Sequence, residues 1–260
     1  MLIFFDIDGT LISEKTHQMA ESAQEAIRQA RAGGHVCMIN TGRTAKLVGP
    51  DVTGIVEFDG LLMGCGTMIT YRGQTLLHRT FSRQEAVDII DGLRRHRMDA
   101  VLEGSRDNFR ERDDRIFSST FREFVHFFDF LHYKGYEEAP GNFDKFYAYA
   151  EKAAYAEAFQ KEFGDRLDFV DRKEGYYEVM PKGHSKASAM GFVSRFLNVP
   201  LSETAAIGDS SNDLAMLACA GIGIAMGNAT EDVKAAADYV TTDVEEDGIE
   251  NALRWLGAIV

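Results

Sequence analysis

The sequence of 260 residues predicts an α/β protein: a Rossmann-like, doubly wound parallel-sheet core with an inserted α+β domain. Short, continuously apolar segments alternate with helical segments at both ends of the chain, which is typical of a parallel sheet covered on both faces. The middle third has a different pattern, with short strands, few helices and many aromatic residues. We therefore predict a discontinuous core of residues 1–81 and 182–260 and an inserted domain of residues 82–181.

The first part of the core is predicted to alternate strands with a helix. The helix keeps Ala23, Ile27 and Ala30 on one face, and two glycines follow it as a stop signal. A hairpin is expected over residues 68–80, with its turn at Arg72 and Gly73. The expected strands are residues 2–5, 35–40 and 54–58, and the expected helix is residues 21–34.

The inserted domain is predicted to open with a helix that starts in a capping box. Ser82 is its N-cap, and Glu85 follows three residues later. A second helix places Phe121, Phe124 and Phe128 on one face, which indicates a core-packing face rather than a ligand-stacking stripe. The charged run 106–115 is interpreted as a solvated loop. The expected helices are 82–97, 119–132 and 151–163, and the expected strands are 99–104, 145–150, 167–172 and 176–181.

The first pattern returns after residue 181 and completes the core. Apolar strands again alternate with helices, so both ends of the chain are expected to contribute to one sheet. The expected helices are residues 184–197, 212–221, 230–238 and 248–257, and the expected strands are residues 204–209, 222–226 and 239–242.

Composition excludes several classes of protein. The formal net charge of −13 argues against nucleic-acid binding, which depends on Lys and Arg contacts to phosphates. The first residues lack the basic region of a signal peptide, and no apolar run reaches about 18 residues, so no membrane span is expected. The three cysteines are widely spaced and form no CxxC motif, which favours a reducing compartment. We expect a cytoplasmic protein, and the oligomeric state stays open.

Four polar clusters lie where predicted strands end or a helix begins. Ligands bind at the carboxyl ends of the strands of a parallel sheet, so these clusters are expected to converge although the chain separates them widely. Any one of them alone also has an ordinary explanation as a turn, a helix cap or a surface lysine. The clusters are Asp6 with Asp8, the stretch NTGR at 40–43, Lys186, and the stretch GDSSND at 208–213.

The residue types in these clusters indicate phosphate chemistry with a metal ion. Several carboxylates together with Asn212 form a hard oxygen site that suits Mg²⁺, and the absence of His and Cys disfavours zinc. Thr41, Lys186 and free amides after Asp6 could hold phosphate oxygens. One carboxylate could act as nucleophile, and a second, two residues along, could protonate the leaving group and then activate water. The expected ligand is a small phosphorylated metabolite.

With these residues identified, the sequence resembles the haloacid dehalogenase superfamily of phosphotransferases. DIDGT at 6–10 matches its first motif, Thr41 its second, Lys186 in GHSK its third, and GDSSND its fourth. The position of the insertion, the NTGR form and the tail EEDGIENAL at 245–253 resemble Cof-type sugar phosphatases, whose inserted domain is a type IIB cap.

The resemblance implies a role for each matching position. Asp6 would be the nucleophile, and Asp8 would be the general acid/base. Thr41, Gly42 and Lys186 would bind the transferred phosphoryl group. Asp8 would contribute to the metal through its main-chain carbonyl, while Asn212 and Asp213 would hold the metal or orient its ligands. The implied metal site, for Mg²⁺, comprises Asp6, Asp8, Asp209, Asn212 and Asp213.

One stretch departs from the resemblance. Many Cof-type relatives carry NGA after the third strand, where the Asn faces the substrate pocket, and this sequence has Cys65, Gly66 and Thr67. A thiol cannot replace the donors and the acceptor of an amide. These three residues and Arg43 remain candidates for contacting the substrate. Further candidates are Arg106, Arg110, Arg112, Arg115 and His184.

The expected activity is Mg²⁺-dependent hydrolysis of phosphate monoesters, with sugar phosphates as the first substrate class, through an aspartyl phosphate. Asp8 favours this, because within the superfamily only the phosphatases must protonate an alkoxide leaving group. Two alternatives stay open: a hexose phosphomutase of the same superfamily, and a phosphometabolite-binding regulator without catalysis. The identity of the phosphorylated substrate cannot be read from the sequence.

Overall fold

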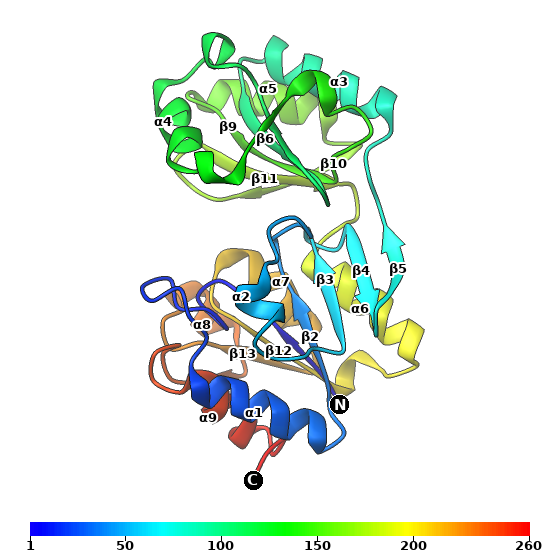
Figure 1. Ribbon diagram of the computed structural model, residues 1–260, viewed down its shortest axis with the longest axis vertical. Helices are drawn as coiled ribbons and strands as arrows, with labels where there is room; N and C mark the ends of the chain where they lie inside the picture. Colours follow the sequence, from blue (N-terminus) through cyan, green and yellow to red (C-terminus); the bar gives the residue numbers. More distant parts are fainter. The chain divides into compact units, whose positions relative to one another are not determined.

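The computed structural model describes all residues, 1–260, and divides into two compact units (Figure 1). We call them the core unit and the cap unit. The core unit contains residues 1–43, 47–77 and 185–260. The cap unit contains residues 44–46 and 78–184. The larger part of the cap unit is thus a continuous stretch between two halves of the core.

The core unit is built on one sheet of eight strands in the order β14-β13-β12-β1-β2-β3-β4-β5. The six strands from β14 to β3 are parallel to their neighbours, and β4 runs antiparallel to β3. The turn between β4 and β5 lies at Arg72 and Gly73, both with positive φ, which confirms the predicted hairpin. The strands are β1 (Leu2–Phe5), β2 (Val36–Asn40), β3 (Gly60–Met63), β4 (Met68–Tyr71), β5 (Gln74–His78), β12 (Thr204–Gly208), β13 (Ile222–Ala225) and β14 (Tyr239–Val240).

Helices cover both faces of this sheet, which confirms the doubly wound architecture. Strand β1 is buried on both sides: Ile3 and Phe5 join the cluster that contains α1 and α9, while Leu2 and Phe4 join the one that contains α6, α7 and α8. Such double burial explains why the strand is continuously apolar. The helices are α1 (Glu21–Ala32), α2 (Pro50–Thr53), α6 (Lys186–Leu197), α7 (Leu214–Cys219), α8 (Glu231–Ala236) and α9 (Gly248–Trp255).

The predicted strand at residues 54–58 is wrong. The short helix α2 ends at Thr53, and the third strand of the sheet begins only at Gly60. Val56 and Phe58 still pack into the core beside α1, but they do so from a loop. Burial explains their apolar character without any sheet pairing, so an apolar run alone could not distinguish the two cases.

The cap unit has its own sheet of six strands in the order β10-β11-β9-β6-β7-β8. Helices α3 and α5 pack on one face, and α4 packs on the other through Phe121 and Val125. Phe121 and Phe124 stack on tyrosines of the sheet, which confirms a core-packing face for this helix. The elements are β6 (Asp99–Glu103), β7 (Asn108–Arg110), β8 (Lys134–Gly135), β9 (Lys145–Tyr149), β10 (Leu167–Asp171), β11 (Tyr176–Pro181), α3 (Arg83–Arg95), α4 (Ser119–Phe127) and α5 (Ala153–Phe163).

In the cap unit, one local sequence signal is confirmed and two predicted elements differ from the structure. The capping box is confirmed: the Glu85 amide donates to Ser82 Oγ, and the Ser82 amide donates to Glu85 Oε2. The predicted solvated loop at residues 106–115 is wrong in part, because residues 108–110 form strand β7, which pairs with β6. The predicted helix at 119–132 ends at residue 127, and a 3-10 turn follows. No helix in either unit is long and apolar enough to cross a bilayer.

Candidate active site

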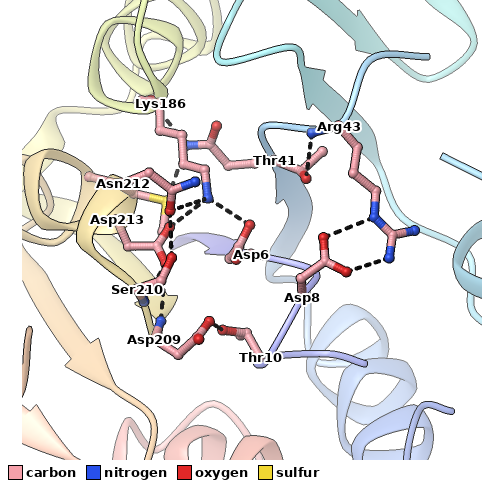
Figure 2. A network of polar contacts seen from close by, with 12 residues as sticks. Asp6, Asp8, Thr10, Thr41, Arg43, Lys186, Asp209, Ser210, Asn212 and Asp213 are labelled. Atoms are coloured by element: carbon pink, nitrogen blue, oxygen red, sulfur yellow. Dashed lines mark hydrogen bonds and ion pairs between the residues drawn. The ribbon is translucent and has the colours of Figure 1, made fainter. Parts of the chain in front are cut away.

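The four polar clusters of the sequence come together at one edge of the core sheet (Figure 2). Strand β1 lies between β2 and β12, and all three are parallel. Asp6, Thr41 and Asp209 each follow directly after one of these strands, so the topology brings them to the same edge. Asp6 is only 5% exposed and Thr41 is 1% exposed.

The loop after Asp6 is a tight turn closed on its own backbone. The amides of Thr10, Leu11 and Ile12 all donate to the carbonyl of Ile7, and the amide of Gly9 donates to the carbonyl of Ile12. Most of the loop's donors are therefore already used. The amides of Ile7 and Asp8 have no partner in the structure and remain available to an anion.

Gly9 allows this loop to approach the late acidic segment. Its φ is +77°, and a Cβ at this position would lie 2.4 Å from Asp209 Oδ2. The Thr10 hydroxyl donates to Asp209 Oδ1 at 2.9 Å, which ties the two segments together. Any side chain larger than a hydrogen at position 9 would displace the Asp209 carboxylate from this contact.

Lys186 is the first residue of α6 and reaches into the centre of the cluster. Its Nζ lies 2.6 Å from Asp6 Oδ1, 2.6 Å from Asp213 Oδ1 and 3.4 Å from Asn212 Oδ1. The residue is 2% exposed. Burial alone lowers the pKa of Lys186, but Asp213 and Asp6 outweigh it and raise the pKa above its ordinary value. Lys186 therefore stays protonated, as a buried charge held by two carboxylates.

Three carboxylates meet beside Lys186. One oxygen from each of Asp6, Asp209 and Asp213 lies within 4.8 Å of the others. Burial, and then the negative charge of Asp213, raise the pKa of Asp6 well above its ordinary range and the pKa of Asp209 to about 7. One lysine thus compensates this group of acids only in part. A divalent cation with a preference for oxygen ligands fits both the donor set and the excess negative charge.

Asp213 and Asn212 also organise the loop around the acids. Asp213 Oδ2 accepts the amides of Asp209 and Ser210, both at 3.0 Å. The Ser210 hydroxyl donates to Asn212 Oδ1 at 2.7 Å. These bonds hold the segment after β12 in a turn in which Asp213 contacts Lys186 and Asp209 contacts Thr10.

Asp8 has a different environment from the other acids. Its carboxylate is directed at Arg43, which donates from Nε at 2.9 Å and from Nη2 (Figure 2). The side chain is 50% exposed and lies outside the three-carboxylate group. The predicted contribution of Asp8 to a metal is through its main-chain carbonyl, which does not require the side chain to join this group.

The backbone beside Thr41 offers further donors. The amide of Gly42 has no partner, and Thr41 Oγ1 accepts the amide of Arg43 at 3.1 Å while keeping its own proton to donate. The carbonyl of Thr41 accepts the amide of Cys65 at 3.0 Å. Thr41 and Gly42, two of the predicted phosphate ligands, therefore offer unused donors at fixed positions, whereas the third, Lys186, is engaged with Asp6, Asp213 and Asn212.

Residues 64–67 form a turn in which Gly64, Cys65 and Gly66 all have positive φ. Asparagine tolerates this conformation better than most residues, which gives a backbone reason for the Asn of the resembling sequences. Cys65 is 3% exposed, and the Thr67 hydroxyl donates to the carbonyl of Gly64. A Cβ on Gly66 would come within 2.9 Å of the carbonyl of Ser185, so this turn packs closely on the start of α6.

Sequence reasoning missed two amides that support the site. Asn228 Nδ2 donates to the carbonyl of Gly9 at 2.7 Å, and Asn40 Nδ2 donates to the carbonyl of Lys186 at 3.0 Å. Asn40 belongs to the NTGR stretch, but nothing in that motif specified a partner 146 residues away. Asn228 follows β13, so its position just beyond a strand of the same sheet was the available signal.

The remaining substrate candidates belong to the cap unit. Arg110 pairs with Asp113, and Arg112 pairs with Asp114. Arg115 has no ion pair in the structure, and the His184 ring contacts the carbonyl of Lys182.

Comparisons with known proteins identify the family of this chain. The family described as haloacid dehalogenase-like hydrolase matches residues 3–253. The chain is 30% identical to the phosphatase YwpJ of Bacillus subtilis strain 168, covering 98% of this chain and 99% of that protein. It is 32% identical to the putative phosphatase YkrA of the same organism, covering 99% and 98%.

Solved structures extend this likeness to the fold. The phosphatase BT1666 from Bacteroides thetaiotaomicron superimposes with a TM-score of 0.84 at 26% identity, covering 99% of this chain and 95% of that one. The HAD subclass IIB sugar phosphatase BT4131 superimposes with a TM-score of 0.81 at 27% identity, covering 99% of both chains. The chain therefore belongs to the haloacid dehalogenase-like hydrolases and is a phosphatase of that family.

Proposed function

We propose that the protein is a Mg²⁺-dependent phosphatase that hydrolyses monoesters of small metabolites, with sugar phosphates as the first substrate class. One observation carries this proposal: Asp6 is paired with Lys186 and lies close to two further acids, in a loop whose main-chain amides include some that have no partner. A buried carboxylate next to unused anion donors is suited to receive a phosphoryl group rather than to stabilise the fold.

Asp6 is the proposed nucleophile. Its Oδ1 is held by Lys186 at 2.6 Å, which leaves Oδ2 to attack the phosphorus of a bound monoester. The bond from phosphorus to the ester oxygen breaks, and an aspartyl phosphate forms. Lys186 holds the attacking carboxylate in place and offsets negative charge on the transferred group, which is the main work of phosphoryl transfer.

The transferred group is proposed to bind to a hydroxyl and three amides that are free in the structure, and to Lys186. The free donors are the Thr41 hydroxyl and the amides of Gly42, Ile7 and Asp8. Lys186 Nζ, which donates to Asp6, Asp213 and Asn212, would exchange one of these contacts for a phosphoryl oxygen. Because these groups are already fixed by the fold, little reorganisation is needed when charge develops on the phosphoryl oxygens.

Mg²⁺ would be held by Asp6, Asp209 and Asp213, with the Asp8 carbonyl as a further ligand. When bound, it would neutralise the carboxylates and the phosphoryl oxygens together. Asn212 contributes indirectly in this arrangement, because it accepts from Ser210 and from Lys186.

Asp8 is the proposed general acid and base. Its carboxyl group gives a proton to the leaving oxygen as the phosphorus–oxygen bond breaks. The resulting carboxylate then takes a proton from water, whose oxygen attacks the phosphorus of the aspartyl phosphate. The products are the alcohol and inorganic phosphate, and the carboxylate of Asp6 is regenerated.

The cap unit is proposed to select the substrate, with residues 82–181 as the specificity domain and residues 1–81 and 182–260 as the catalytic core. The sugar-phosphate class is supported by the similarity to the sugar phosphatase BT4131. The acidic composition and the widely spaced cysteines support a cytoplasmic enzyme that does not act on nucleic acid.

The test is phosphate release from a panel of sugar, polyol and nucleotide monophosphates with purified protein and Mg²⁺. We expect turnover that stops with EDTA and in Asp6→Asn, and a ranking by kcat/KM that places sugar phosphates first. An isomerised sugar phosphate with little free phosphate would identify a mutase. Tight binding without turnover would identify a regulator, and either result would overturn the proposal.

A further inference from the structure

Asp8 has one polar partner. Arg43 donates to both carboxylate oxygens, from Nε to Oδ2 at 2.9 Å and from Nη2 to Oδ1, and no other group bonds to this side chain. Asp8 is 50% exposed, so without Arg43 its carboxylate would sample several rotamers in solvent. The two-point contact therefore decides where this carboxylate lies.

Arg43 is itself held on its other side. Its Nη1 donates to the carbonyl of Leu47 and to Asp51 Oδ2, both at 3.4 Å, and its amide donates to Thr41 Oγ1. A guanidinium group has five N–H donors, and four of these are engaged. Little capacity remains for a substrate, which argues against the expected substrate contact and in favour of a role toward Asp8.

The pair also borders open space. A cavity of about 300 Å³ is lined by Asp8, Arg43, Asp51 and His17, together with residues 12–14. All of these residues belong to the core unit. The carboxylate of Asp8 is thus fixed at the wall of a cavity large enough for a small leaving group.

We propose that Arg43 is a positioning residue, which holds the Asp8 carboxyl group where it can transfer a proton to the leaving oxygen. This inference rests on the proposed function. Arg43 takes part in no bond change: the proton moves from Asp8 to the ester oxygen, and Arg43 fixes the donor. Proton transfer depends steeply on the placement of the donor, so loss of the clamp affects the step that needs the proton.

The experiment compares two substrates that differ in their need for a proton. Phenolate is a poor leaving group and needs protonation, whereas p-nitrophenolate leaves readily without it. We expect Arg43→Ala to lower kcat/KM for phenyl phosphate roughly 10- to 100-fold more than for p-nitrophenyl phosphate. Arg43→Lys keeps the charge but not the two-point contact, so an intermediate effect is expected.

Arg31→Ala is the matched control. Arg31 also contacts one aspartate, Asp59, through Nε and Nη2, and its side chain is 24% exposed, compared with 22% for Arg43. Arg31→Ala should change kcat/KM for the two substrates by the same factor. Thermal unfolding shows whether each variant is folded, and Arg43→Lys serves if Arg43→Ala does not fold.

A double-mutant cycle completes the test. In an Asp8→Asn background, Arg43→Ala should lower kcat/KM for p-nitrophenyl phosphate little further, because the two residues act as one unit. The inference would be overturned if Arg43→Ala lowered kcat/KM equally for both substrates. It would also be overturned if the two substitutions lowered kcat/KM additively in the double variant. If the unmodified protein hydrolyses neither substrate, the proposed function fails instead, so the two failures are distinguishable.

Discussion

Each of the two units buries one lysine between two carboxylates. In the core unit, Lys186 lies 2.6 Å from both Asp6 and Asp213. In the cap unit, Lys145 lies 2.7 Å from Glu178 and 3.1 Å from Glu103. The two arrangements are nearly identical in charge type and burial. They differ in whether the surrounding groups remain free to bind a ligand.

The cap arrangement is a product of strand pairing. Glu103 on β6 stands directly opposite Lys145 on β9, and Glu178 lies on the neighbouring β11. Side chains at paired positions share one face of the sheet, so the register alone brings these charges together. All three residues lie inside strands, where the backbone amides are committed to the sheet.

The core arrangement lies just beyond the strands, in loops and at a helix start. It includes one acid more than the cap arrangement, Asp209, and adjoins the unpartnered amides of Ile7, Asp8 and Gly42. Excess negative charge and unused donors are what a metal ion and a phosphate group require. A buried cluster of charges therefore indicates a catalytic or binding site only when neighbouring groups remain free to bind a ligand.

The largest expected effect is that of Lys186→Met. The substitution removes the proposed phosphoryl contact and leaves two buried acids without their cation. We expect kcat for p-nitrophenyl phosphate to fall on the order of 10³-fold and the free energy of unfolding to fall roughly 3–5 kcal/mol at pH 7. Steady-state kinetics and urea unfolding measure the two effects, and activity within tenfold of the unmodified enzyme would contradict the assignment.

Lys145→Met sharpens the comparison. It should lower the free energy of unfolding by a similar amount, roughly 3–5 kcal/mol, because Glu103 and Glu178 lose a buried partner. Turnover per folded molecule should change far less than in Lys186→Met. Replacing both glutamates by Met in the same chain should recover most of the stability, since apolar side chains often substitute well for buried ions. A loss of turnover equal to that of Lys186→Met would break the distinction.

Gly9→Ala tests how the core cluster is assembled. At φ +77°, its Cβ would meet Asp209 Oδ2, whereas Gly34, at φ +87°, has no atom within 4 Å of the corresponding position. Gly34→Ala should therefore cost only the backbone strain, about 1–2 kcal/mol. Gly9→Ala should cost more and should also abolish turnover. Equal activities in the two variants would show that contact between the two loops is unimportant.

The smallest effect concerns Glu85, an acid of the cap unit with a 37% exposed side chain that pairs with Arg79. Burial raises its pKa, but hydrogen bonds from Arg79 and Ser82 outweigh burial and lower the pKa to about 2. A lowered pKa in the folded state stabilises the protein above the ordinary value of 4.5, and this contribution is lost as pH falls toward 2.

Glu85→Gln removes this charge while keeping the capping box. At pH 7 the variant should be less stable by under about 1 kcal/mol, because solvent screens the pair. The difference from the unmodified protein should shrink below pH 4.5, as measured by thermal unfolding at pH 7 and at about pH 3.5. A difference that grows on acidification would contradict the assigned sign.

The sequence predicted the topological centre of the protein well. Continuously apolar strands and their helices specified a parallel sheet, and this sheet explains why Asp6, Thr41 and Asp209 converge. Lys186 could be placed because a helix start has few possible positions relative to the strands that flank it. These inferences depend on periodicity and topology, which a sequence records directly.

Other features depend on contacts that a sequence does not record. Nothing local separates the apolar residues 54–58, which pack from a loop, from a true strand. The pairing of Asp8 with Arg43 depends on two side-chain rotamers across adjacent strand ends. The side-chain amide of Asn228 meets the carbonyl of Gly9, 219 positions away in the sequence, only when the chain has folded. Such pairings follow from the assembled structure rather than from any motif.

The start of α6 has a consequence for exchanging the inserted unit. Ser185 caps the helix by accepting the amide of Ser188, and the turn at Gly66 packs against the carbonyl of Ser185. The direction in which the Lys186 side chain leaves α6 is thus fixed by contacts within the core unit alone. An inserted unit of another length could be transplanted from a related protein if the junction falls before Ser185. A junction within the helix would instead change the direction in which Lys186 points.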